Sequence, residues 1–157
     1  MKFVYTDKKN EEMRHILMMR PDLEEAKARL EQDDTDGRAL YEYATALANN
    51  GRLEEAVEVY SKGIAFNPFY APCYFGRGRR NNALGHFWGA VADFSVAIQL
   101  DPSCWTYWYY RATTLNLKDY VEESMDDFRQ CLHLSQPAEH YPLIHWLYTS
   151  NVQLGRF

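Results

Sequence analysis

The sequence lacks the features that mark membrane-spanning, secreted and nucleic-acid-binding proteins. It contains no run of about 18 unbroken apolar residues, the length that a membrane-spanning helix requires. Residues 1–13 have neither the apolar core nor the small-residue cleavage site of a secretion signal. No long basic tract is present, and the net charge is −5. We therefore expect neither a membrane nor a nucleic acid as a partner.

Cysteine is also scarce. The three cysteines lie at 73, 104 and 131, and their odd number and wide spacing suit a reducing compartment better than a disulfide framework. Together with the missing secretion signal, this predicts a cytoplasmic location. Cys131 falls at a small packing position of the pattern described below, whereas Cys104 falls in a turn between helices, where its thiol could be exposed.

Constellations of catalytic or metal-binding residues are missing as well. None of the five histidines lies three or four residues from another His or Cys, the spacing that puts two ligands on one face of a helix. No Ser/His/Asp order or carboxylate pair has a catalytic arrangement. Paired acidic residues such as Asp126 and Asp127 are interpreted as solvated outer faces of helices. We therefore expect a non-enzymatic protein without a metal or a cofactor.

The sequence is rich in aromatic residues, with 12 Tyr, 8 Phe and 4 Trp, and it carries an internal repeat. Small or aromatic residues recur at one constant step in the stretches 39–68, 73–102 and 107–137. A repeat of this kind determines the architecture of the whole chain. The recurring sets are Ala44, Gly78 and Ala112; Gly51, Gly85 and Asp119; Ala56, Ala90 and Ser124; Tyr60, Phe94 and Phe128; and Gly63, Ala97 and Cys131.

Each unit is predicted to be a pair of antiparallel helices. In the first unit, apolar residues at helical spacing over 40–47 mark one helix, which Gly51 ends. A second apolar stripe begins at Leu53. Small residues let the two helices of a unit approach each other, with Gly78 and Ala90 as a predicted contact pair. The aromatic set is expected to fill the space between successive units.

This pattern resembles the tetratricopeptide repeat, whose units carry small and aromatic residues at fixed offsets and follow one another at a period of about 34 residues. The resemblance implies an all-α, right-handed superhelix of antiparallel helical hairpins, an α-solenoid. We expect one domain over 1–157, made of a degenerate helical unit at 8–36, repeats at 37–70, 71–104 and 105–138, and a half-repeat or capping helix at 139–157. The sequence given stops at LGRF, the expected turn of that last unit.

By the same resemblance, the first helix of each unit lines a concave face that binds a protein or peptide partner, in an adaptor or scaffold role. Recurring asparagines could form a ladder of amides along an extended peptide, aromatic residues could form apolar pockets, and Arg79 could bind a carboxylate. The alternative is that the aromatic residues pack among themselves and the asparagines face water. The expected contact positions are Tyr41, Thr45, Asn49, Phe75, Arg79, Asn82, Tyr109, Tyr110, Thr113 and Asn116.

The best-known partner of the family, the acidic C-terminal tail of the Hsp70 and Hsp90 chaperones, is disfavoured. Family members bind that tail through lysine, asparagine and arginine at five positions. Here those positions hold Tyr41, Thr45, Gly76, Thr106 and Tyr110, none of which matches.

A second hypothesis is that copies of the chain associate through an apolar C-terminal helix, or that the chain is a fragment of a longer array. A terminal cap normally presents a polar outer face, and exposed apolar surface often marks an interface. The residues expected on this association surface are Trp146, Leu147, Leu154 and Phe157.

Overall fold

The computed structural model describes residues 2–135, 144–145, 149–150 and 152–155, and the side chains of these except 2–7 and 10. The predicted all-α fold is confirmed, because this part of the chain contains helices and no strand. No described helix is long and apolar enough to cross a membrane. The helices are α1 (Lys2–Met18), α2 (Leu23–Gln32), α3 (Gly37–Asn49), α4 (Leu53–Phe66), α5 (Ala71–Ala83), α6 (Phe87–Leu100), α7 (Trp105–Asn116) and α8 (Val121–Leu134).

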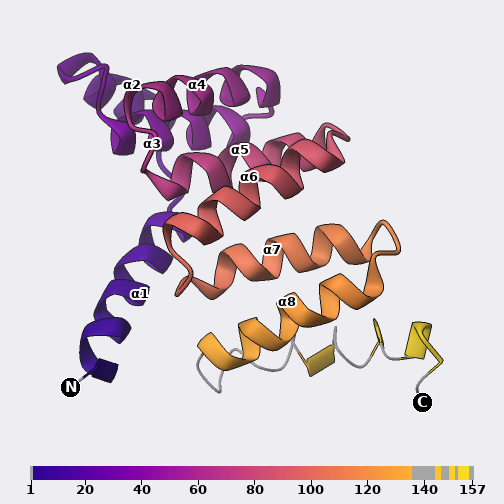
Figure 1. Ribbon diagram of the computed structural model, residues 1–157. Coiled ribbons are helices and arrows are strands. Elements are labelled where there is room, and N and C mark those ends of the chain that lie inside the picture. The colour runs from indigo at the N-terminus through magenta and orange to yellow at the C-terminus, as the bar shows by residue number, and fades with distance from the viewer. Residues whose placement is uncertain (1, 136–143, 146–148, 151, 156–157) are drawn as a thin grey trace.

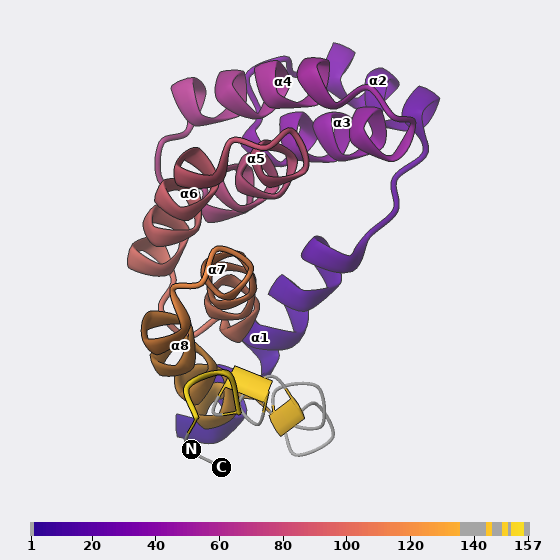
Figure 2. The ribbon, with the colours of Figure 1, turned by 90° about the vertical axis from the view of Figure 1, so that its right-hand side faces the viewer.

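Three hairpins stack into a curved array (Figures 1 and 2). They are α3–α4, α5–α6 and α7–α8, and α3, α5 and α7 lie on the inner side of the curve (Figure 2). The turn inside each hairpin needs a left-handed backbone. Gly51 and Gly85 supply it in the first two, with φ of 78° and 82°. In the third, Asp119 adopts φ of 64°, which aspartate tolerates better than most side chains.

The aromatic set of the repeat forms the centre of the core. Tyr60, Phe94 and Phe128 are each fully buried. Close approach to these rings explains two of the glycines. A Cβ on Gly76 would overlap the ring of Tyr60, and a Cβ on Gly78 would lie 2.7 Å from Cε1 of Phe94. The ring of Phe94 therefore lies nearest to the side-chain position of Gly78, and the pairing of Gly78 with Ala90 stays a prediction.

Helix α1 departs from the hairpin pattern. The expected degenerate unit at 8–36 holds two helices, but α1 runs away from α2 and lies on the inner side of the array, facing α7 (Figure 2). Ile16 and Leu17 of α1 are buried in one apolar cluster with Tyr41, Phe75 and Tyr107. This contact between the start of the chain and the later hairpins brings α1 to the concave face.

The C-terminal segment is described only in part. Gly155 has φ of 69°, close to the values of the two hairpin glycines, so it takes the turn conformation expected from the repeat. Ser150 is buried and its Oγ accepts a hydrogen bond of 2.8 Å from Nδ2 of Asn116. Of the residues predicted for an association surface, Leu154 is half-buried, whereas Trp146, Leu147 and Phe157 lie outside the described residues.

Candidate functional site

A pocket of about 430 Å³ lies between the N-terminal segment and the concave face. We call it the α1 pocket. One wall comes from α1 and the residues that follow it, and the other from α3, α5 and α7. The first wall consists of Arg14, Leu17, Met18, Met19 and Arg20, and the second of Thr45, Asn49, Phe75, Arg79, Arg80, Trp105, Thr106, Tyr109 and Tyr110.

The structure brings together some of the predicted contact positions and separates others. Six of them line the α1 pocket, namely Thr45, Asn49, Phe75, Arg79, Tyr109 and Tyr110. The remaining four, Tyr41, Asn82, Thr113 and Asn116, lie outside its lining. The predicted set therefore marks the correct face for this pocket, but four of its members lie outside the lining.

Two aromatic residues expected to be exposed on the concave face are buried. Tyr41 is 3% exposed and Phe75 is 1% exposed. Phe75 packs against Phe94, Tyr107 and Tyr110, with ring centroids 5.0–6.0 Å apart. The expectation of exposure is thus corrected, and the alternative that these aromatic residues pack among themselves holds for both.

The polar positions of the predicted ladder are also engaged inside the fold. Nδ2 of Asn82 donates to Oγ1 of Thr114 at 3.2 Å. Asn116 is buried, and its Nδ2 donates to Oγ of Ser124 at 3.3 Å as well as to Ser150. The expectation that both amides would be exposed on the concave face is therefore corrected for Asn116, and Asn82 is only half-exposed.

Two further polar positions bond within the fold. Thr45, also expected to be exposed, is buried and its hydroxyl lies 2.8 Å from the hydroxyl of Tyr60. The hydroxyl of Thr113 donates to the backbone oxygen of Tyr110 at 3.1 Å. These side chains use hydrogen-bonding capacity on the scaffold, which limits what they can offer a ligand.

The inner wall of the α1 pocket combines aromatic faces with a cation. The guanidinium of Arg79 lies over the ring of Tyr110 at 5.0 Å and that of Phe75 at 5.7 Å. Tyr109 makes edge contacts with Tyr110 and with Trp105. This arrangement holds the guanidinium against the rings while its N–H groups remain able to donate.

Charge in the lining has one sign. Arg14, Arg20, Arg79 and Arg80 all line the α1 pocket, and no Asp or Glu of the described residues does. The family resemblance pointed to Arg79 alone. Arg80 follows it directly on α5, while Arg14 and Arg20 reach the site only because α1 docks on the concave face, so sequence spacing contained no signal for them.

The thiols have surroundings that disfavour nucleophilic chemistry. Burial raises the pKa of Cys73 to about 12 and that of Cys104 to about 11, which keeps both protonated near neutral pH. Cys104 is buried, so the expectation that a turn would expose it is corrected. In the described part of the chain, no three His, Cys, Asp or Glu side chains converge on a point that could hold a metal ion.

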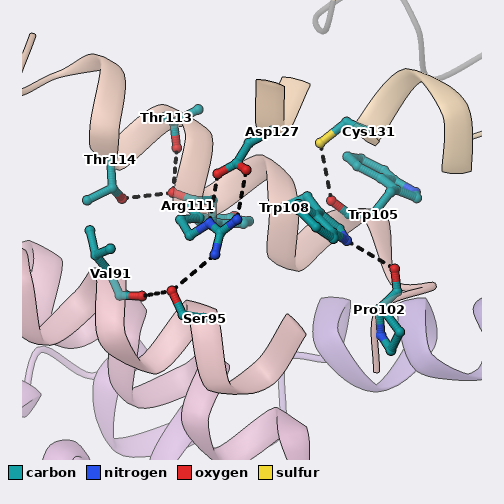
Figure 3. Close-up of polar contacts among 11 residues, drawn as sticks. Val91, Ser95, Pro102, Trp105, Trp108, Arg111, Thr113, Thr114, Asp127 and Cys131 are labelled. Atoms are coloured by element: carbon teal, nitrogen blue, oxygen red, sulfur yellow. Dashed lines mark hydrogen bonds and ion pairs between the residues drawn. The ribbon is translucent and has the colours of Figure 1, made fainter. Parts of the chain in front are cut away.

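A second group of arginines joins the hairpins. Arg77 binds both carboxylate oxygens of Asp93 at 2.8 and 2.9 Å and donates to Oγ of Ser61 at 3.2 Å. Arg111 repeats this arrangement one repeat unit later with Asp127 and Ser95 (Figure 3). We call each set an arginine clamp, because it links two consecutive hairpins.

The arginine clamps correct one sequence interpretation. Asp127 was assigned to a solvated outer face, but it is 5% exposed. Burial raises the pKa of its carboxyl, and the hydrogen bonds from Arg111 oppose that rise. A detectable signal was present in the sequence. Ser, Arg and Asp follow each other at equal steps in both sets, 61–77–93 and 95–111–127.

Comparison with known proteins agrees with this architecture. The stacked hairpins define an α-solenoid of the tetratricopeptide repeat type, and residues 37–70 match the family model described as Tetratricopeptide repeat. No curated protein matches the chain.

Solved structures with the same fold come from different organisms. MamA from Desulfovibrio magneticus is 19% identical with a TM-score of 0.72, over 85% of this chain and 74% of its own. The first tetratricopeptide repeat domain of Spaghetti (RPAP3), bound to an HSP90 peptide, is 21% identical with a TM-score of 0.71, over 76% of this chain and 96% of its own. SycD of Yersinia enterocolitica, in complex with a peptide of the translocator YopD, is 17% identical with a TM-score of 0.69, over 73% and 92%.

Proposed function

We propose that this chain is a non-enzymatic interaction module that binds a peptide segment or helix of a partner protein in the α1 pocket. The observation that carries the proposal is the pocket itself, in which aromatic rings from α5 and α7 lie together with arginines from α5 and from the α1 segment. Structures of the same fold support the proposal, since RPAP3 and SycD were each solved with a bound peptide. At 21% and 17% identity these structures share the fold with this chain, and the partner follows from the chemistry of its own pocket.

Peptide binding fits the form of the pocket. Its volume of about 430 Å³ lies within the range of ordinary ligand pockets, and aromatic residues can cover a peptide's apolar side chains while arginines bind its polar groups. The α1 pocket is lined by residues of α3, α5 and α7, the helices on the inner side of the curve (Figure 2), where a solenoid offers its most extended surface.

Partner capture with a matched pair of variants tests the proposal. The captured protein is first identified by mass spectrometry and then measured as a purified partner. We expect Arg79→Ala to weaken its binding by about tenfold or more, since a charged hydrogen bond and an aromatic stack are lost. Asn82→Ala lies on the same helix outside the pocket and serves as the control. Equal affinity for Arg79→Ala and wild type, with unchanged circular dichroism, would rule out this pocket.

A second candidate role is association of copies through the C-terminal segment. Two apolar side chains in it, Ile144 and Val152, are 55% and 46% exposed. Light scattering over a range of concentrations measures the molar mass directly. If copies associate, the molar mass of the wild type rises with concentration. The molar mass of Val152→Glu should stay at the monomer value. A monomer at every concentration excludes it.

A further inference from the structure

We propose that the peptide recognised by the α1 pocket is acidic and that α1 itself supplies part of its binding site. This inference rests on the proposed function and adds the chemistry of the partner. The arginines involved differ from the cations of the chaperone-tail clamp. None of the five clamp positions holds a cation in this chain, although Thr45, Thr106 and Tyr110 among them line the α1 pocket.

The arginines of this chain fall into two groups by their partners. Six of them form an ion pair with a carboxylate in the described structure, namely Arg29, Arg38, Arg52, Arg77, Arg111 and Arg129. Arg20, Arg79 and Arg80 form none within the described residues, and all three line the α1 pocket. The arginines that lack a carboxylate in this part of the chain therefore gather at one site.

Arg80 shows the missing acceptor most directly. Its Nε atom is buried and has no hydrogen-bond partner within the described part of the chain. A buried donor on a charged group is rarely left unsatisfied. Arg79 lies beside it, held against the ring of Tyr110, with a planar set of donors that suits a carboxylate. Carboxylates from a ligand would satisfy both groups.

Several contacts hold α1 in place as the second wall. Leu17 is buried against the concave face, Nζ of Lys9 lies 3.6 Å from Oδ1 of Asp101, and the hydroxyl of Tyr107 lies 3.4 Å from Sδ of Met13. Because these contacts hold α1 on the concave face, Arg20, which follows α1, lies in the wall opposite Arg79 and Arg80 of α5. An acidic peptide between the two walls meets positive charge from both sides.

An acidic peptide fits better than the other common polyanion, a nucleic acid. The net charge of the chain is −5, so repulsion acts against a long phosphate backbone outside the pocket, whereas a short peptide places its charge only inside it. Aromatic rings between the arginines also match apolar side chains placed among carboxylates.

Fluorescence anisotropy with designed probes tests the inference. The probes are a labelled ten-residue peptide of alternating Glu and Leu, the same peptide with Gln for Glu, and a single-stranded oligonucleotide of ten thymidines. We expect the Glu peptide to bind about tenfold or more tightly than the Gln peptide, with an affinity that falls as salt is added. Equal binding of the Glu and Gln peptides, no binding of the Glu peptide, or tighter binding of the oligonucleotide overturns the inference.

Variants separate the two parts of the inference. Arg80→Gln and Arg20→Gln are each expected to lower the affinity for the Glu peptide by about threefold to tenfold. Arg129, an exposed and ion-paired residue on α8, is the control, and Arg129→Gln should leave that affinity unchanged. Leu17→Asp loosens α1 and is expected to weaken binding too. If Leu17→Asp binds the Glu peptide more tightly than the wild type, α1 competes with the ligand and does not form part of the site. Arg20→Gln tests the same point without disturbing the packing of α1.

The acidic preference and the proposed peptide pocket can fail separately in these experiments. A Gln peptide that binds as well as the Glu peptide, and whose binding is weakened by Arg79→Ala, would leave the peptide pocket intact and remove only the acidic preference. If the natural partner instead binds Arg79→Ala as tightly as the wild type, the pocket is not the site of interaction.

Discussion

Arg77 and Arg80 lie less than one turn apart on α5, yet they belong to different parts of the protein. Arg77 points into the hairpin interface and is matched by the buried carboxylate of Asp93 and by Ser61. Arg80 faces the α1 pocket and has no carboxylate partner in the described structure. Buried charge that is matched holds the fold together, while charge near a pocket that is left unmatched is available to a ligand. The two groups should therefore respond to substitution in opposite ways.

The largest expected effect on stability comes from breaking an arginine clamp. Arg77→Leu leaves Asp93 buried without its partner, which should lower the free energy of unfolding by about 3 kcal/mol. Urea denaturation followed by circular dichroism measures the change. Arg80→Leu, three residues further along the same helix, is the control, and its stability should fall by much less because it leaves no carboxylate unpaired. A similar loss in both variants would show that the two arginines do not differ in the way proposed.

Steric matching at the hairpin interface should give the next largest effect. Gly76→Ala places a methyl group into the ring of Tyr60, and the resulting overpacking should cost about 2 kcal/mol of unfolding free energy. Gly89→Ala is the matched control, because the nearest atom to its new Cβ is 3.6 Å away. In a helix, that exchange should be neutral or stabilising. The melting temperatures of the two variants are compared with that of the wild type. If Gly76→Ala melts at the wild-type temperature, the close packing against Tyr60 is contradicted.

The repetitive part of the fold could be predicted from the sequence because it is encoded locally. Helices α3 to α8 follow from apolar spacing, hairpin glycines and the constant step of the repeat, and the aromatic set reached its expected place in the core. Helix α1 could not be placed in the same way. It carries no copy of the repeat, and contacts such as that between Met13 and Tyr107 join residues far apart in the sequence. Local patterns carry no information on such a contact.

The candidate site was predictable to the extent that it belongs to the repeat. Family positions on α3, α5 and α7 led to Arg79 and Tyr109, which line the α1 pocket. Arg14 and Arg20 depend on the docking of α1, and Arg80 lies outside the family positions. The sequence left two alternatives for Tyr41, exposure or packing among aromatic residues, because the outcome depends on how rings from different helices pack against one another.

The smallest effect concerns the serine of each arginine clamp. Ser95 accepts a hydrogen bond from Nη1 of Arg111 at 3.1 Å (Figure 3), and Ser95→Ala should cost about 1 kcal/mol of unfolding free energy. Its other bond, to the backbone oxygen of Val91, lies within its own helix and should matter little. Because the clamps repeat, Ser61→Ala should cost about as much.

A double-mutant cycle shows whether the serine acts through the arginine. In the Arg111→Leu background the acceptor at Ser95 has lost its donor, so Ser95→Ala should change the unfolding free energy by less than about 0.5 kcal/mol. Urea denaturation of the four proteins in the cycle measures this coupling. If Ser95→Ala costs the same with and without Arg111, the serine contributes through its own helix alone, and the clamp consists of the arginine and the aspartate.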